Sequence, residues 1–289
     1  MGLRAKFNLV IVFAFLIGFA VAAVVLNRVF VQNAREQILQ NARIMMAGAN
    51  AIRSYTVTDL GPLLSTERGG KFVPETVPAY AAQRNFRQIQ DVFSGFSYRE
   101  AALNPTNLVD RAYDWEADII NLFRNDSGRP ELVIERDTPT GMLLHLARPI
   151  SVRSERCLVC HSTPAEAPPA LVNSYGPTHG FGWKLNEVIG AQILSMPMEI
   201  PLKLAREAYL TFLAMLTGIF AVVFVILNLL LHYLVLAPVK RVSAMADKVS
   251  LGEEDVETYV KPGKDEISSL SVSFNRMRES LKHAMDMLK

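Results

Sequence analysis

The sequence predicts an α+β domain that lies between two transmembrane helices and is followed by two helices of a parallel coiled coil. Two apolar runs, about residues 9–26 and 209–235, are each long enough to cross a bilayer as a helix. The segment between them begins with helical patterns and ends with strand-like ones. Beyond the second run, apolar residues recur at alternating intervals of three and four, as they do in a coiled coil.

The composition excludes some classes of partner. The chain has 289 residues, half of them hydrophobic, and a formal net charge of only +2. Such a balance gives no reason to expect nucleic acid or a strongly acidic partner.

The N-terminal run is interpreted as an uncleaved membrane helix. Residues 1–8 would form a short cytoplasmic N-terminus and residues 9–29 the first span. The alternative is a cleaved signal peptide, because Ala20-Val21-Ala22 resembles a small-residue cleavage site. The apolar stretch is longer than a usual signal core, however, and it continues into a polar helical segment without Gly or Pro.

Residues 30–207 are predicted to form one domain with its own core. Its first part favours three helices, at residues 33–55, 79–92 and 111–123, with a turn at Asn104-Pro105-Thr106-Asn107 before the third. Residues 131–135 and 142–150 favour a hairpin around residues 138–141, and residues 187–196 favour a closing strand. The second span would then cover residues 208–235.

The C-terminal segment, residues 236–289, carries two apolar stripes separated by a non-helical connector at residues 252–264. Two heptad-like helices of this kind bury their stripes when the protein dimerises. The first stripe is formed by Val235, Pro238, Val242, Met245 and Val249, and the second by Ile267, Leu270, Phe274, Met277, Leu281, Ala284 and Leu288.

The segment Cys157-Leu158-Val159-Cys160-His161 has the spacing that attaches a c-type haem covalently. Two thiols three positions apart can each form a thioether with one vinyl group of the same porphyrin. The following residue, His161, brings an imidazole to the iron as the proximal ligand. Because the chain has only two cysteines, we predict one covalently attached haem c held by Cys157 and Cys160.

Three other interpretations of this motif are less favoured. A thioredoxin-type redox pair normally opens a helix after a strand in a βαβ unit, whereas this pair lies between a charged stretch and a Pro-rich loop. A zinc site would need a second pair of ligands at usable spacing, and a disulfide across two residues would be strained.

The chain resembles two known families. Residues 236–289 resemble the HAMP signalling linker through Pro238, Gly252 and Asp265-Glu266-Ile267. The segment between the spans resembles the c-type-haem sensor domains with a PAS-like fold. The matching segments are residues 53–56, 72–80, 104–107, 147–150, 157–164 and 180–187.

The sequence also offers candidates for the remaining haem contacts. Met46 is the favoured sixth iron ligand, and the alternatives are Met45, Met142, Met196, Met198, His145 and His179. Arg53 and Arg148, with Lys184 behind them, are the candidates to bind the haem propionates. Trp183 and Tyr55, together with Phe181, are the candidates to pack on the porphyrin.

The resemblance implies a haem-bearing sensor in the bacterial inner membrane. Because bacterial c-type haem is attached outside the cytoplasmic membrane, we expect a two-pass protein with its sensor domain in the periplasm and its HAMP linker in the cytoplasm. The expected signal is a redox state or a diatomic gas such as NO, CO or O2. It would pass through a homodimer to a separate kinase, cyclase or chemoreceptor-type partner. The alternative is a membrane-anchored electron-transfer cytochrome; no motif indicates an enzyme.

Overall fold

The computed structural model describes residues 1–289 except 65–66, 140, 254–255 and 288–289. The chain divides into two compact units. One is Arg28–Glu207, and the other combines Met1–Asn27 with Ala208–Lys289. The α+β class and the two long apolar helices that flank the domain are as the sequence predicts. Thr140 of the expected hairpin turn and Leu288 of the second stripe lie outside the described residues.

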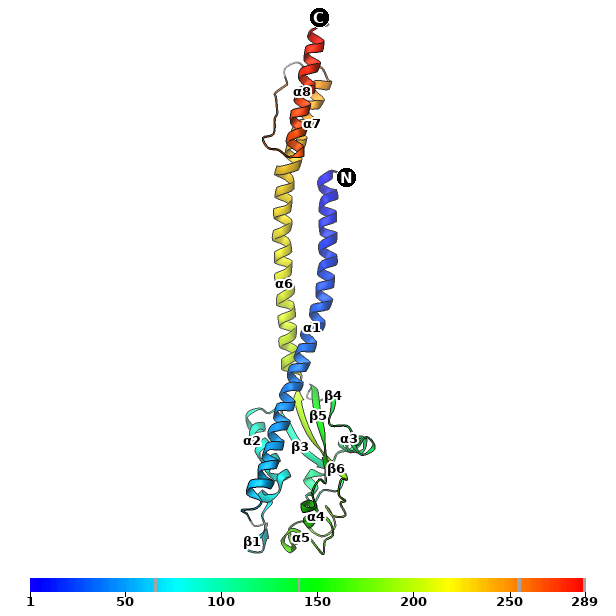
Figure 1. The fold of residues 1–289 in the computed structure, drawn as a ribbon, viewed down its shortest axis with the longest axis vertical. Coiled ribbons are helices and arrows are strands. Elements are labelled where there is room, and N and C mark those ends of the chain that lie inside the picture. The colour runs from blue at the N-terminus through cyan, green and yellow to red at the C-terminus, as the bar shows by residue number, and fades with distance from the viewer. Residues whose placement is uncertain (65–66, 140, 254–255, 288–289) are drawn as a thin grey trace. The chain divides into compact units, whose positions relative to one another are not determined.

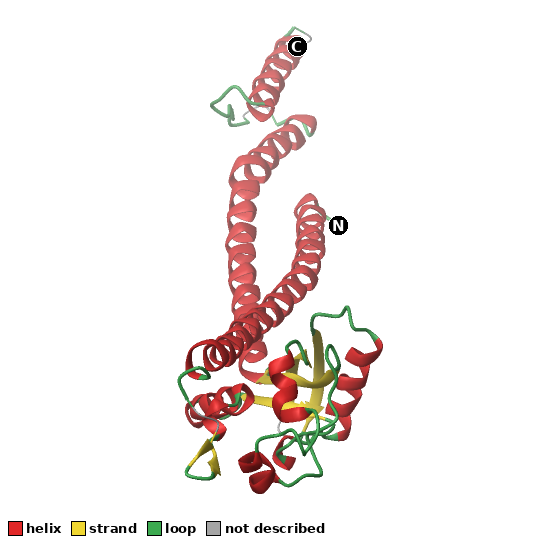
Figure 2. Ribbon diagram, turned by 60° about the horizontal axis from the view of Figure 1, so that its bottom comes forward, coloured by secondary structure: helices red, strands yellow, loops and turns green. Residues whose placement is uncertain are grey.

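The unit Arg28–Glu207 is built around an antiparallel sheet of four strands in the order β3-β6-β5-β4 (Figures 1 and 2). The predicted hairpin and closing strand are confirmed as β4, β5 and β6, and β6 lies inside the sheet between β3 and β5. In chain order the elements are α1 (Leu3–Tyr55), η1 (Thr56–Leu60), β1 (Glu67–Arg68), β2 (Lys71–Phe72), η2 (Pro74–Thr76), α2 (Pro78–Val92), β3 (Ser97–Ala102), η3 (Leu108–Asp110), α3 (Asp114–Asn125), β4 (Leu132–Thr138), β5 (Gly141–Ser151), α4 (Glu155–His161), α5 (Pro169–Tyr175) and β6 (Val188–Pro197).

Helices cover both faces of this sheet. The C-terminal part of α1 packs with α2 on one face, where its buried residues recur at intervals of three and four. Three of them, Ala34, Ala42 and Ala49, are small and let the helix approach the strands closely. The core on this side includes Met46, Leu146 and Leu194. Helix α3 covers the other face with Ile119, Ile120 and Phe123.

Strand β3 was not predicted from the sequence, because its residues do not alternate between apolar and polar. It carries adjacent charges, Arg99 and Glu100, where a half-buried strand usually has one apolar residue. The structure places the two on opposite faces and neutralises both. Arg99 pairs with Glu116 of α3 at 3.1 Å, and Glu100 pairs with Arg53 of α1. The expected Pro-rich loop after the cysteine motif also proves partly helical, since Pro169 begins α5.

The other unit contains two helices long and apolar enough to span a membrane, judged by length and composition. They are the first half of α1 and α6 (Glu199–Leu230), and Phe15 of α1 stacks on Phe220 of α6 with ring centroids 4.7 Å apart. Helix α6 continues through a π-helical turn, η4 (Leu231–Leu236), into α7 (Ala237–Ser250). Pro238 has no N–H to donate to the preceding turn, so a local change of helical pattern is expected there.

The C-terminal segment contains α7 and α8 (Glu266–Asp286) joined by a connector without helix or strand in its described residues. The connector is fixed along α8 by hydrogen bonds. Asn275 donates to the carbonyl of Tyr259, and the Ser271 hydroxyl accepts from the backbone N–H of Lys261. Val242 and Met245 of the first stripe are buried, whereas Leu270, Met277 and Leu281 of the second stripe are about half exposed.

Candidate functional site

The two cysteines lie on helix α4, whose first turn is capped by Ser154. The Ser154 hydroxyl accepts a hydrogen bond from the backbone N–H of Arg156, as expected of a serine at this position. Residues three apart in a helix share a face, so Cys157 and Cys160 point to the same side. Both are half-buried free thiols.

His161 ends the same helix and its ring is held from two directions. Its Nδ1 lies 2.7 Å from the carbonyl oxygen of Gly180, which can only accept, so Nδ1 carries the proton. The Trp183 ring stacks on the imidazole with centroids 3.7 Å apart and planes 14° apart. In the neutral imidazole this tautomer leaves the Nε2 lone pair available to a metal ion.

The loop that supplies Gly180 is tied to the turn after β3. Asn104 accepts a hydrogen bond from the backbone N–H of Gly180 and donates to the carbonyl of Phe181. Gly180 has φ +80°, and a Cβ atom at this position would collide with Thr106. The glycine therefore lets the loop pass close enough to Thr106 for its carbonyl to reach His161.

The pKa shifts at His161 and Cys160 favour a neutral imidazole and a neutral Cys160 thiol. Burial lowers the pKa of His161 below its ordinary value, although the hydrogen bond to Gly180 opposes this shift. Burial, with the neighbouring Cys157, raises the pKa of the Cys160 thiol. A thioredoxin-like pair would instead depend on a lowered thiol pKa and a βαβ unit, whereas every pairing of this four-stranded sheet is antiparallel. Within the described residues no group of three or more His, Cys, Asp or Glu side chains is placed to hold a metal ion.

The structure places Arg53 in a buried polar network. Its guanidinium pairs with Glu100, whose side chain is only 3% exposed. Glu100 also accepts from the Tyr98 hydroxyl at 2.8 Å, and that hydroxyl in turn accepts from Gln192 of β6. Gln192 reaches back to Asn50 of α1 at 2.9 Å, so the network joins α1, β3 and β6.

Arg148 is also engaged by a carboxylate. It donates to Glu131 at 3.0 Å, and Arg43 of α1 binds the same carboxyl group at 2.7 Å. Burial alone would raise the pKa of Glu131, but the two arginines lower it below its ordinary value. Arg53 and Arg148 thus have carboxylate partners within the protein, and in the described part of the chain neither forms a hydrogen bond with His161.

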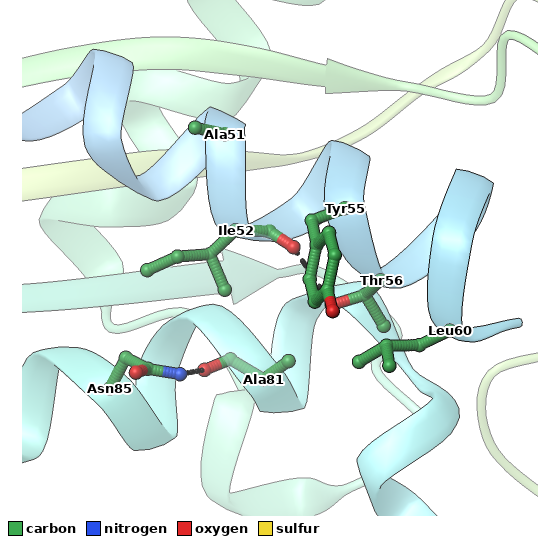
Figure 3. A pocket seen from close by; sticks show the side chains of 7 residues that line it. All are labelled: Ala51, Ile52, Tyr55, Thr56, Leu60, Ala81 and Asn85. Carbon is green, nitrogen blue, oxygen red and sulfur yellow. Dashed lines mark hydrogen bonds between the residues drawn. The ribbon is translucent and has the colours of Figure 1, made fainter.

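Met46 lies in the apolar core between α1 and the sheet. Its side chain is fully buried, and the same cluster contains Met196 and Met198. Tyr55 lines a different feature, a cavity of about 390 Å³ between the end of α1 and α2 (Figure 3). Its other walls come from Ala51, Ile52, Thr56, Leu60, Ala81 and Asn85. Among the sequence-predicted residues, the structure therefore brings Cys157, Cys160, His161 and Trp183 together, and it places Met46, Arg53, Tyr55 and Arg148 in other surroundings.

Gly180 and Thr106 are the functional residues that the sequence did not single out for the site. The matching segments at residues 104–107 and 180–187 contain them, but nothing in their side chains indicates a contact with His161. That contact depends on the loop fold.

Together these features fit a membrane signalling protein, with an α+β sensor-type domain between two candidate membrane helices and a signalling linker at its C-terminal end. The family comparisons agree. The family model Tll0287-like matches residues 31–197, more than half of the chain, and the HAMP domain model matches residues 230–283. The chain belongs to the Tll0287-like family and carries a HAMP domain.

The chain is similar to a solved structure, the crystal structure of the cyanobacterial heme-protein Tll0287. It is 16% identical, the match covers 56% of this chain and 95% of that one, and the TM-score is 0.44. No curated protein matches the chain.

Proposed function

We propose that the protein is a membrane-bound sensor that carries one covalently attached haem c in its periplasmic domain and signals through its HAMP domain. Cys157 and Cys160 would form the thioethers and His161 would be the proximal ligand. The observation that carries the proposal is the hydrogen bond from His161 Nδ1 to Gly180. It orients the imidazole and leaves Nε2 free, beside two reduced thiols on one helix face.

Family and architecture support this proposal. The solved structure to which the chain is similar is of a heme-protein, and HAMP domains lie between membrane helices and signalling outputs. When bound, such a haem supplies a one-electron redox couple and, where an axial position is open, a site for a diatomic gas. The signal would accordingly be a redox state or NO, CO or O2.

The domain's own residues provide a route from this site toward the membrane. The turn at Asn104–Thr106, which contacts Gly180 and His161, directly follows β3, and β3 carries Tyr98 and Glu100 of the buried network. The network reaches α1 through Arg53 and β6 through Gln192, and these two elements lead into the two candidate membrane helices. A shift of β3 would therefore change how α1 and β6 are held together, which is the kind of small displacement that helical signalling elements amplify.

The HAMP domain would pass the signal to the output partner. We propose that a second copy of the chain packs on the half-exposed stripe of α8 and that a separate kinase, cyclase or chemoreceptor-type protein reads the resulting coiled coil. The proposed orientation places the haem domain in the periplasm and the HAMP domain in the cytoplasm.

Substitution of the proximal ligand tests the site. His161→Ala should leave the attached group without its proximal ligand and change the haem absorbance spectrum, whereas His283→Ala, a histidine of α8, should leave that spectrum unchanged. Mass spectrometry of protein matured in a competent host should show one added haem in the wild type and none in Cys157→Ser/Cys160→Ser. A wild-type mass without an added group, or thiols that remain open to alkylation, would overturn the proposal.

Absorbance spectra with CO and NO separate the candidate signals. Binding of either gas to the ferrous protein supports gas sensing, whereas a reversible redox titration without gas binding supports redox sensing. Deletion of residues 238–289 separates a sensor from the electron-transfer alternative. A sensor loses its cellular output with the HAMP domain, and an electron carrier keeps its redox activity.

A further inference from the structure

A second cavity lies on the opposite face of the sheet from α1. It has a volume of about 400 Å³, within the range of small-molecule sites, and lies between the N-terminal turn of α3 and one end of the strands. It is remote from the haem motif along the strands. Ser97, the first residue of β3, lines the cavity, whereas Thr106, beyond the last residue of β3, contacts His161.

The cavity contains a buried histidine with an unsatisfied atom. His145 is 4% exposed, and its Nδ1 lies 2.8 Å from the Ser195 hydroxyl. Its Nε2 is buried and has no hydrogen-bond partner among the described residues. Burial, and secondly the charge of Arg136, lowers the pKa of His145 to about 4, so the ring is neutral near pH 7 and offers one polar atom to a ligand.

Among the charged side chains that line the cavity, one arginine has no ion-pair partner in the described part of the chain. Arg99 and Glu116 neutralise each other at 3.1 Å, and Asp137 is exposed to solvent, where its field is screened. Arg136 has no ion pair in the described part of the chain. Its guanidinium lies over the Trp115 ring, 4.4 Å from the centroid, and is only partly exposed. A cation held in place by an aromatic ring is well arranged to receive a carboxylate.

The other walls are apolar or carry hydroxyl groups. Trp115, Leu143 and Ile193 provide apolar surface, and Ser97 and Ser195 provide hydroxyls. This combination, a partly desolvated cation and a few polar atoms on an otherwise apolar wall, is typical of a pocket for a small organic molecule.

We propose that this cavity binds a small monocarboxylate with an apolar or aromatic body, with its carboxylate on Arg136 and its body against Trp115. The ligand would contact β6 at Ser195, two residues before Pro197 ends the strand and four before α6 begins. The domain would then receive a second chemical input, independent of the haem, on the strand that leads into α6.

Titration of the full-length protein in lipid nanodiscs with sodium benzoate tests the proposal. Benzyl alcohol and benzylammonium are the matched neutral and cationic probes, and calorimetry gives the dissociation constants. The chain has two tryptophans, and the other one, Trp183, lies on His161. Benzoate should therefore change the tryptophan emission of the wild type and leave that of Trp115→Phe unchanged.

The variant Arg136→Gln should weaken benzoate binding at least about tenfold, as expected for the loss of a charge-assisted hydrogen bond. Arg129→Gln, an exposed arginine just before the opposite end of β4, should bind as the wild type does. Circular dichroism of both variants checks that the domain is folded. Because calorimetry does not depend on the haem, this result is separate from the test of the haem site.

The proposal is overturned if benzoate does not bind at about 10 mM, a concentration well above that of a weak specific site. It is equally overturned if benzyl alcohol binds as well as benzoate, or if folded Arg136→Gln retains the wild-type affinity.

Discussion

At the scale of single residues, the orientation of His161 depends on a glycine 19 positions further along the chain. Gly180 and Gly182 both have positive φ, +80° and +79°, but only Gly180 faces a neighbour that a Cβ would meet. A substitution at Gly182 therefore costs backbone strain alone, whereas the same substitution at Gly180 costs backbone strain and a steric clash. A side chain at Gly180 would have to displace either Thr106 or the carbonyl that holds His161.

We predict that Gly180→Ala destabilises the protein more than Gly182→Ala. The left-handed backbone costs each variant about 1–2 kcal/mol, and the clash with Thr106 adds about 1–3 kcal/mol to Gly180→Ala alone. Thermal unfolding measures the difference, and absorbance spectra should show a disturbed proximal ligand only in Gly180→Ala. Equal effects of the two substitutions would contradict the role of the Thr106 contact.

At the scale of elements, two ion pairs join α1 to strands of the sheet, and they differ in how deeply they are buried. Arg35 pairs with Glu135 of β4 near the surface, at 3.1 Å with side chains 53% and 34% exposed. Arg53, further along the helix, pairs with Glu100 of β3, whose side chain is almost completely buried. A buried carboxylate depends on its partner far more than an exposed one, because water replaces a lost partner at the surface.

Glu100→Gln is accordingly expected to lower the free energy of unfolding by about 2–3 kcal/mol, less than for a fully buried pair because Arg53 is partly exposed. Glu135→Gln is the matched control, because its partner Arg35 lies on the same helix as Arg53, and it should cost at most about 0.5 kcal/mol. Denaturant unfolding of the detergent-solubilised protein measures both. If the two variants were equally stable, the buried network would not hold α1 to the sheet.

At the scale of the whole molecule, the HAMP domain of a single chain leaves an apolar stripe of α8 partly exposed. The buried face of α8 is polar, with Ser268, Ser271 and Asn275 bonded within the chain or to the connector. Its apolar stripe, by contrast, remains about half exposed at Leu270, Met277 and Leu281. A half-exposed apolar stripe with heptad spacing is expected to pack against another helix.

Leu281→Glu should therefore weaken self-association more than tenfold, since each copy would lose about 1.5–3 kcal/mol of buried leucine. Lys282→Glu, the adjacent residue outside the stripe, should leave self-association unchanged. Light scattering of the solubilised protein against concentration distinguishes dimer from monomer. A wild type that is monomeric at all concentrations would exclude the proposed homodimer.

Patterns within short segments of the sequence determined much of this protein. The period of apolar residues predicted α2, the β4–β5 hairpin, β6 and the second half of α1. The length of the apolar runs predicted the two long apolar helices. Each of these signals lies within a single element. Spacing alone identified Cys157, Cys160 and His161 as one candidate site, since neighbours on a helix turn need no distant contact to lie together.

Only the tertiary structure decided the rest. Strand β3 pairs with β6, and its charged residues Arg99 and Glu100 find opposite charges on α3 and α1, which no local pattern reveals. The tautomer of His161 depends on a carbonyl from a distant loop, and the cavity around His145 depends on residues from four strands and a helix. Contacts between residues far apart in the chain are set by the packing of whole elements, so their chemistry appears only once those elements are in place.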